Sequence, residues 1–350
     1  MTAVHVVVPD GIDDPARPSG GNVYDRRVSN GLGSLGWSVR EHAVAGAWPR
    51  PDAASSTALA DVVQGIPDDA VVLLDGLIAS TAPEVLVPHA RRLRLVVLVH
   101  MPLGHDSEHA RAREGAVLSA ASAVVTTSHW TRRRLLELYP LPGDRLHVAE
   151  PAVDAAELAA VTRDGGALLC VAAVIPGKGH DVLLDALATV IDLRWRCVCV
   201  GSLERDPAHA ARLCRRSRDG GLDDRVAFAG PRNGADLDRC YAAADVLVLA
   251  SRAETYGMVV SEALARGLPV IAADVGGLTE ALGHGAGGAR PGLLVPPGDP
   301  IALGAALRRW LGDAELRARL RRAARERRAS LLGWPATTAV IAGVLAGVSR

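Results

Sequence analysis

The sequence predicts an α/β protein built from two doubly wound domains, each a parallel sheet covered by helices. Short apolar runs recur along the chain, and each is followed by a longer stretch with helical periodicity. This alternation pauses around Glu150–Asp154 and then begins again. Strands alternating with helices are typical of parallel sheets. Because such sheets bind ligands at the carboxyl ends of their strands, we expect a ligand cleft between the two domains.

Two series of apolar runs predict the strands. The first series is Val4–Val8, Val39–Val44, Ala70–Leu74, Leu95–Val99 and Ala123–Thr126. The second series is Leu168–Val171, Cys197–Val200, Val226–Ala229, Val246–Leu249 and Val270–Ala273. We therefore expect an N-terminal domain over residues 1–152 and a C-terminal domain over residues 153–333.

Composition narrows the class of protein. A chain of 350 residues with 49% hydrophobic content is globular and long enough for two or three domains. Its 39 basic and 39 acidic residues cancel, which argues against a nucleic-acid partner. The five cysteines form no C-x-x-C motif, and Cys197 and Cys199 share one face of an expected strand, so we interpret them as core residues in a reduced compartment. There is no basic leader and no run of the roughly 20 apolar residues that span a bilayer. We expect a cytoplasmic protein.

Glycine pairs and one histidine mark the first domain. Gly20 and Gly21 lie in the expected loop between the first strand and first helix, where glycine permits close backbone approach; simple turn chemistry is the alternative. Gly31–Gly36 has the pattern G-x-G-x-x-G, but it closes a helix instead of following a strand, so we expect helix termination and no dinucleotide site.

His100 follows the strand Leu95–Val99, where it could donate to a ligand hydroxyl or shuttle a proton, unless local backbone groups satisfy its hydrogen bonds. For the basic stretch Arg132–Arg134 we favour a solvated face over contact with a membrane surface.

The stretch Ser251–Val270 predicts an anion site. We expect a loop that holds Glu254, a helix that begins near Gly257 and ends at Gly267, and then another strand. Free N–H groups at Gly257–Val259 would bind phosphate, and the carboxylates of Glu254 and Glu262 would accept hydrogen bonds from hydroxyl groups. This pairing suits a sugar nucleotide. Alternatively, Glu254 only complements the helix dipole and Glu262 is a solvated helix residue.

Lys178 is a second candidate. It stands between two glycines in the loop after the strand Leu168–Val171, a position well placed to meet a diphosphate. Its ammonium group could neutralise charge that grows on a departing nucleotide. Asp236–Asp238 is a D-x-D string, which in some transferases holds a metal. Here it begins a helix after Gly234, so we attribute it to dipole complementation and predict no metal.

The string from Glu254 to Val270 resembles the signature of the family-4 retaining glycosyltransferases, E-x-[FYW]-G-x4-E-A-x3-G-x-P-V. Asp274–Glu280 and Gly292–Asp299 are similar to further segments of that family. The resemblance implies the GT-B arrangement, two Rossmann-like domains facing each other across a cleft. It also implies that a last helix, residues 334–350, crosses back onto the N-terminal domain.

The same resemblance assigns expected roles. Glu254 and the amides near Gly257 would hold the sugar and a phosphate, Glu262 the ribose, and Lys178 the leaving diphosphate. His100 with Gly20 and Gly21 would face the transferred sugar. The remaining expected donor contacts are Ser202, Arg232, Arg252, Tyr256, Met258 and Val259. The implied reaction moves a sugar from a nucleoside-diphosphate sugar, with UDP as the favoured base, to a hydroxyl of a small-molecule or lipid acceptor, without a cofactor.

One departure from the family pattern leaves alternatives open. Members of the family usually carry the motif G-R-x4-K-G, whereas this chain has Ala172 and Ala173 in place of the Gly-Arg pair. We expect Arg252, or else Arg232, to replace the missing cation. The alternatives are a UDP-sugar epimerase of the same fold, a catalytically weak sugar-nucleotide-binding protein, and a dinucleotide-dependent oxidoreductase that uses Gly31–Gly36.

Overall fold

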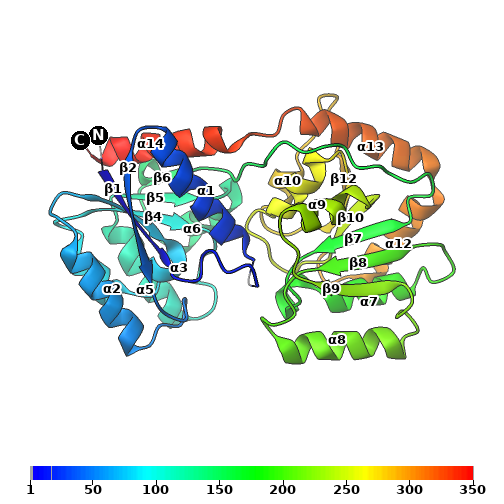
Figure 1. Ribbon diagram of the computed structural model, residues 1–350, viewed down its shortest axis with the longest axis horizontal. Coiled ribbons are helices and arrows are strands. Elements are labelled where there is room, and N and C mark those ends of the chain that lie inside the picture. The colour runs from blue at the N-terminus through cyan, green and yellow to red at the C-terminus, as the bar shows by residue number, and fades with distance from the viewer. Residues whose placement is uncertain (1–2, 17, 350) are drawn as a thin grey trace. The chain divides into compact units, whose positions relative to one another are not determined.

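The computed structural model describes residues 3–16 and 18–349 and contains two six-stranded parallel sheets (Figure 1). The chain divides into two compact units. The first unit holds the N-terminal residues through Asp13, Ser19–Ala152 and the segment from Gly333 onward. The second unit holds Asp14–Pro18 and Val153–Leu332. The predicted α/β class with two doubly wound sheets is confirmed.

The first sheet has the strand order β2-β1-β3-β4-β5-β6. Its strands are β1 (Ala3–Pro9), β2 (Ser38–Val44), β3 (Val71–Asp75), β4 (Arg94–Val99), β5 (Ala123–Thr126) and β6 (Leu146–Val148). Every residue of β3 and β5 is buried, because helices cover both faces of a parallel sheet. The strand order reverses between β1 and β3. The loops that follow these strands therefore open side by side at the carboxyl edge.

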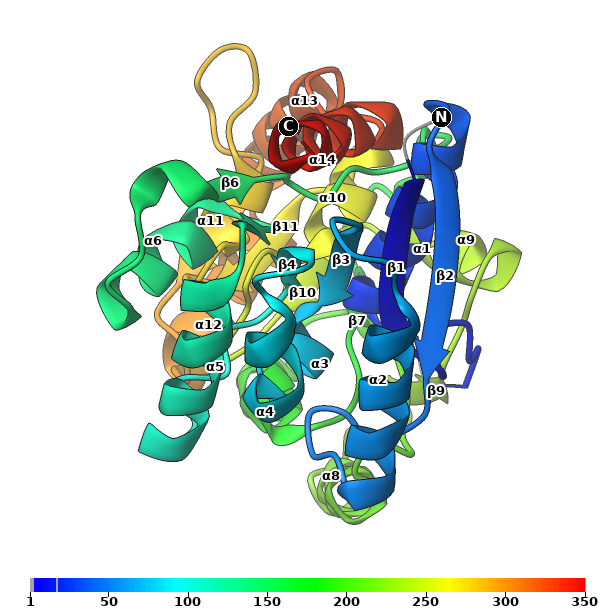
Figure 2. The ribbon, with the colours of Figure 1, turned by 90° about the vertical axis from the view of Figure 1, so that its left-hand side faces the viewer.

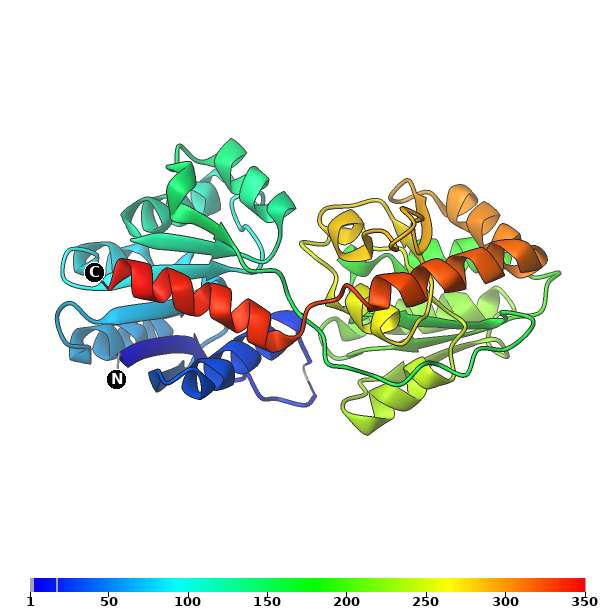
Figure 3. The ribbon, with the colours of Figure 1, turned by 90° about the horizontal axis from the view of Figure 1, so that it is seen from above.

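Helices cover both faces of this sheet, with α1 and α14 together on one face (Figure 3) and α2 and α5 on the other (Figure 2). The helices of the first unit are α1 (Gly20–Ser34), α2 (Ala53–Gly65), α3 (Gly76–Ala79), α4 (Pro83–Leu86), η1 (Val87–His89), α5 (Glu108–Ala120), α6 (His129–Leu138), η2 (Gly143–Arg145) and α14 (Trp334–Val348). Among the described residues, no helix combines the length and the apolar character needed to cross a membrane.

The second sheet has the order β12-β11-β10-β7-β8-β9. Its strands are β7 (Ala167–Val171), β8 (Arg196–Val200), β9 (Val226–Gly230), β10 (Val246–Leu249), β11 (Val270–Ala273) and β12 (Gly292–Val295). The helices of this unit are η3 (Pro176–Lys178), α7 (His180–Ala188), α8 (Pro207–Asp219), α9 (Ala235–Ala242), α10 (Met258–Ala265), α11 (Leu278–Leu282), α12 (Pro300–Gly312) and α13 (Ala314–Arg328). The order reverses between β7 and β10, so the loops carrying Lys178 and Glu254 leave neighbouring strands at the same edge.

The expected strands all form, with ends that shift by a residue or two, and the short edge strand β6 is an addition. The expected loop at Gly20 and Gly21 is wrong, because these glycines are the first two residues of α1. Gly31–Gly36 ends that helix as expected: α1 stops at Ser34, and Gly36 adopts a φ of 85°. The G-x-G-x-x-G string therefore does not follow a strand, which removes the structural basis for a dinucleotide site.

Gly31 lets α14 pack closely on α1. A Cβ atom at Gly31 would lie 2.5 Å from Thr338 Oγ1 and 2.9 Å from its Cγ2, and that hydroxyl is already bonded to the Trp334 carbonyl oxygen. Gly33 lies in the same helix, but a Cβ there would meet nothing within 4 Å.

These two glycines predict opposite effects of the same substitution. Gly33→Ala should stabilise the protein by about 0.5–1 kcal/mol, since alanine loses less backbone freedom in a helix. Gly31→Ala should destabilise it, because overpacking costs about 1–3 kcal/mol and outweighs that gain. Thermal unfolding of the two variants checks this, and an equal shift in both would contradict the close α1–α14 packing.

Candidate functional site

Two loops of the second unit bring the expected catalytic residues together. Lys178 Nζ lies 2.5 Å from Glu254 Oε1, although the residues are 76 positions apart in the chain. The Ser251 hydroxyl donates to the same carboxylate oxygen at 3.0 Å. Both side chains are mostly buried, with 27% of Lys178 and 12% of Glu254 exposed. The ion pair therefore places a cation and a carboxylate at the point where the strand order reverses.

Arg252 joins these two loops. Its backbone N–H donates to the Gly177 carbonyl at 2.9 Å, and its guanidinium donates to both Asp181 oxygens at 2.8 and 2.6 Å and to the Pro176 carbonyl. The hydrogen bond from Arg252 lowers the pKa of Asp181. Arg252 was expected to replace the missing cation of the family pattern. In the structure its guanidinium instead ties the Glu254 loop to the start of α7.

Glycines permit the close approach of these loops. Gly179 adopts a φ of 65°, and a Cβ there would overlap the Ala250 carbonyl. Gly276, at a φ of 56°, and Gly277 lie against the backbone carbonyls of Glu254 and Thr255, and the Gly277 N–H donates to the Glu254 carbonyl at 3.1 Å. The Gly276-Gly277 turn therefore supports the Glu254 loop from behind. The sequence showed this glycine pair but not what it contacts.

The amino end of α10 follows Glu254 directly. Gly257 is its N-cap residue at a φ of 92°, without a side-chain cap, and the first turn holds no acidic residue. Met258 and Val259 are half-buried there. A helix start of this kind offers N–H groups to an anion. Tyr256 was expected to contact the donor, but its side chain is 5% exposed and belongs to the apolar core.

Glu262 is held by a partner that the sequence did not indicate. The buried Tyr241 hydroxyl donates to Glu262 Oε2 at 2.6 Å, and the Arg266 guanidinium lies 4.6 Å from the centre of the Tyr241 ring. Burial raises the pKa of Glu262, against the opposing effects of the Tyr241 hydrogen bond and the Arg266 charge. Tyr241 thus fixes one carboxylate oxygen and leaves the other for a ligand hydroxyl.

Ser202 and Arg232, two of the expected donor contacts, have surroundings that differ from those of the Lys178–Glu254 pair. Ser202 is buried, and its hydroxyl accepts from the Glu204 N–H at 3.3 Å. Arg232 is exposed at a cavity of about 690 Å³ that is lined by residues of β7, β8 and α9. Asp236 and Asp238 pair with Arg239 and Arg266, and they lie in the first turn of α9 as expected.

In the first unit, His100 lies against the start of α1. A Cβ at Gly21 would come within 3.3 Å of the His100 ring, so a side chain there would press on the imidazole. His100 Nε2 lies 2.7 Å from Asp25 Oδ1 and 4.0 Å from Asp75 Oδ2. The sequence pointed to His100 and Gly21 but missed both aspartates.

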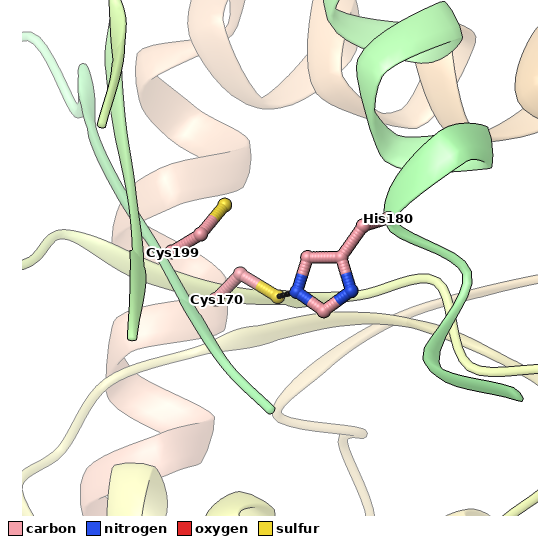
Figure 4. A group of neighbouring side chains, drawn as sticks. All are labelled: Cys170, His180 and Cys199. Atoms are coloured by element: carbon pink, nitrogen blue, oxygen red, sulfur yellow. Dashed lines mark hydrogen bonds between the residues drawn. The ribbon is translucent and has the colours of Figure 1, made fainter. Parts of the chain in front are cut away.

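A second cluster, shown in Figure 4, contains Cys170, His180 and Cys199. All three are buried, their ligand atoms lie within 4.8 Å of one another, and Cys170 Sγ is 3.7 Å from His180 Nε2. Structural zinc takes four ligands, and the described residues gather three here. The pKa of the Cys170 thiol is raised, mainly by its contact with Cys199 and to a lesser extent by burial. The expected core role of Cys197 and Cys199 is confirmed, since each is 1% exposed.

The glycine turn behind Glu254 generates a prediction about stability. Gly276→Ala should destabilise the protein by more than the about 1–2 kcal/mol that a left-handed alanine costs, because its Cβ would also displace the Glu254 carbonyl. Gly298→Ala is the matched control, since Gly298 adopts a φ of 73° but has open space around it. Thermal unfolding should rank Gly276→Ala well below Gly298→Ala; equal midpoints would show that the turn does not support the loop.

Solved structures show the same fold. The sucrose-phosphate synthase of Thermosynechococcus elongatus superposes with a TM-score of 0.81 at 22% identity, covering 99% of both chains. The Anabaena protein HepE in complex with UDP-glucose superposes with a TM-score of 0.79 at 20% identity, covering 99% of this chain and 100% of its own. The expected GT-B fold is thereby confirmed.

Sequence comparison points to one family. Curated relatives include the D-inositol 3-phosphate glycosyltransferases of Jonesia denitrificans, 32% identical over 66% of this chain and 59% of the relative, and of Kineococcus radiotolerans, 37% identical over 64% and 57%. The chain thus spans less than two thirds of the length of these relatives. Residues 161–327 match the family model described as glycosyl transferases group 1, and this region includes Lys178, Glu254 and Glu262. The expected resemblance is confirmed: this region is similar to the group 1 glycosyltransferases.

Proposed function

We propose that this protein is a retaining glycosyltransferase that moves a sugar from a nucleoside-diphosphate sugar, with UDP as the nucleotide, to an acceptor hydroxyl. The observation that carries the proposal is the Lys178–Glu254 ion pair beside the uncapped amino end of α10. Similarity to the group 1 family and the UDP-glucose bound by HepE support the same donor chemistry.

Each group has a role that its surroundings favour. Lys178 supplies the mobile cation for the diphosphate, because Arg252 is bound to Asp181 and the family's usual arginine is Ala173. The N–H groups at the start of α10 bind a phosphate oxygen. Glu254 accepts hydrogen bonds from the sugar, and Glu262, fixed by Tyr241, accepts from the ribose. We assign His100, with Gly20 and Gly21, to the transferred sugar.

The reaction proceeds by attack on the same face as the leaving group. The bond from the anomeric carbon to the phosphate oxygen breaks with both electrons on oxygen, and the acceptor oxygen forms the new bond on that face. The acceptor proton passes to the departing diphosphate. Electrostatic stabilisation of that diphosphate by Lys178 and the α10 amides lowers the barrier.

For the acceptor we propose a hydroxyl of a small molecule or lipid. The similarity to D-inositol 3-phosphate glycosyltransferases favours a small phosphorylated polyol within that class. An epimerase of the same fold would convert a UDP-sugar without any acceptor, so analysis of products formed from the donor alone distinguishes the two. A protein that only binds sugar nucleotides is favoured by one observation, the loss of the arginine at Ala173.

The donor base is predicted by ligand-induced stabilisation. UDP-sugars should raise the unfolding midpoint more than GDP- or ADP-sugars, because a ligand at 100 times its Kd adds about 2.7 kcal/mol to the free energy of unfolding. Thermal shift with UDP-glucose, UDP-N-acetylglucosamine and their GDP and ADP counterparts measures this. If none of these donors stabilises the protein, the proposed function is wrong.

Glu254→Gln tests the enzyme assignment. The amide keeps the shape of the side chain but loses the charge that faces Lys178 and the sugar, so turnover should fall by about 100-fold or more. Glu315→Gln, at an exposed position in the first turn of α13, is the matched control and should keep wild-type turnover. Retained activity in Glu254→Gln would refute the role of Glu254.

A further inference from the structure

Three polar side chains meet inside the first unit. Asp25 lies on α1, Asp75 ends β3, and His100 follows β4. Asp25 and Asp75 are only 5% and 4% exposed, and their carboxylates lie with the His100 imidazole within 4.8 Å of one another. The small cavity beside the two carboxylates is otherwise lined by apolar side chains: Val6, Val8, Val28, Leu73 and Leu98. Apolar residues of similar volume would suit this position at least as well, so the fold alone does not explain the cluster.

The His100 ring is fixed on several sides. Its edge contacts Gly21, and the Tyr24 ring stands edge-on at 5.2 Å between centres. Tyr24 is itself held, since its hydroxyl donates to the Ala149 carbonyl at 2.9 Å. Asp25 binds Nε2 at 2.7 Å. Nδ1 therefore remains as the nitrogen that can serve a ligand.

The two carboxyl groups have different surroundings. Asp75 Oδ1 accepts from the Leu77 N–H at 2.6 Å, whereas Asp25 Oδ2 is buried without a partner among the described residues. Burial, followed by the nearby Asp25 charge, raises the pKa of Asp75 to about 8. Asp75 is then protonated at neutral pH, and its proton supplies a donor for Asp25. Asp25 Oδ1 faces the imidazole.

The neighbouring Asp25 carboxylate decides the state of His100. Burial by itself would lower the pKa of His100, but the charge and hydrogen bond of Asp25 and the proximity of Asp75 outweigh it and raise the pKa to about 9. Because Asp75 is neutral at pH 7, Asp25 is the principal cause. The other titratable group packed against the ring, Tyr24, has a pKa raised well above 10 by burial and is neutral.

We propose that Asp25 and Asp75 are positioning residues that fix His100 as an imidazolium, so that its Nδ1–H donates a hydrogen bond to the bound donor sugar. This inference rests on the proposed function. It makes His100 a permanent hydrogen-bond donor at neutral pH, and it excludes His100 as the base that takes the acceptor proton. Asp25 binds the ring directly, and Asp75 is the second buried carboxyl group of the cluster, 4.0 Å from the same nitrogen.

The first experiment measures the imidazole in the free protein. With ring-15N histidine, and His100 assigned through His100→Gln, the wild-type ring should titrate near pH 9, against an ordinary value of 6.5. Asp25→Asn should lower this pKa, and the double variant Asp25→Asn with Asp75→Asn should bring it below 6.5. Asp75→Asn alone should leave it high. The matched control is Asp13→Asn. Asp13 is exposed and pairs with Arg26, which lies on the same helix as Asp25, so this substitution should leave the pKa of His100 unchanged.

The second experiment measures turnover. Asp25→Asn should lower kcat/KM for the donor at least tenfold, mainly through KM, and should make activity depend on pH between 6 and 8, where the wild type is flat. The inference is overturned if the wild-type His100 titrates near pH 6.5, or if Asp25→Asn does not shift the pKa of His100. The wild-type titration needs no variant, so it decides the question even if every variant folds poorly. If the titrations behave as expected but no UDP-sugar is turned over by the wild type, the cluster stands and the proposed function fails.

The pH dependence of stability gives an independent check. Both pKa values are raised in the folded state, so the folded protein binds more protons than the unfolded chain. The contribution of His100 is complete below about 6.5 and is lost as the pH rises through about 9. That of Asp75 is complete below about 3.8 and is lost through about 8. These two groups should therefore lower the unfolding midpoint as the pH rises from about 4 to about 9, and His100→Gln with Asp75→Asn should flatten this fall. An equal slope in the double variant would contradict the assigned protonation states.

Discussion

The arrangement of the second unit depends on one ion pair, between Lys178 and Glu254. The two residues come from loops that leave adjacent parallel strands at the point where the strand order reverses. Two partly buried charges in such a place are stable only when they are paired and hydrogen-bonded, which the Ser251 hydroxyl completes. A ligand that carries both a diphosphate and hydroxyl groups can separate this ion pair. Its diphosphate can take the place of Glu254 beside Lys178, and its hydroxyl groups can take the place of Lys178 beside Glu254. The pair is therefore a preformed site whose two halves separate only for a ligand with complementary groups.

The loops around this pair are held by contacts that leave the two functional groups free to serve a ligand. Arg252 binds Asp181 and two backbone carbonyls, and Gly276 and Gly277 pack against the backbone of Glu254. None of these contacts uses the Lys178 ammonium. Positioning by backbone and by a neighbouring ion pair thus fixes the geometry of these loops. Tyr241 acts in the same way on Glu262, at one oxygen only.

The sequence predicts most of the fold and part of the site, for a physical reason. Strands such as Ala123–Thr126 and Val246–Leu249 are continuous apolar runs because helices bury both faces, and such runs are visible in a single sequence. Lys178 and Glu254 were found because glycines and an adjacent helix start mark loops at strand ends. Asp25, Asp75 and Tyr241 were missed. Each acts through a partner that is 21 to 75 positions away, and an aspartate on a helix has no local signal that it is buried against a histidine. Tyr256 was expected to contact the donor, and its side chain lies in the apolar core, because a motif position does not reveal which way the side chain points.

The two units place charge at their strand ends by different means. In the second unit the cation is an ammonium on a flexible stem, which can follow a diphosphate as charge grows on it. In the first unit the proposed cation is the His100 imidazolium, whose ring is packed between Asp25, Tyr24 and Gly21 and would donate to a ligand from Nδ1. A rigid donor discriminates between sugars by the position of a hydroxyl, whereas a mobile cation stabilises a charge that all nucleoside-diphosphate donors share. Under the proposed roles, selectivity for the sugar and stabilisation of the leaving group belong to separate units of the chain, so either could change by substitution without loss of the other.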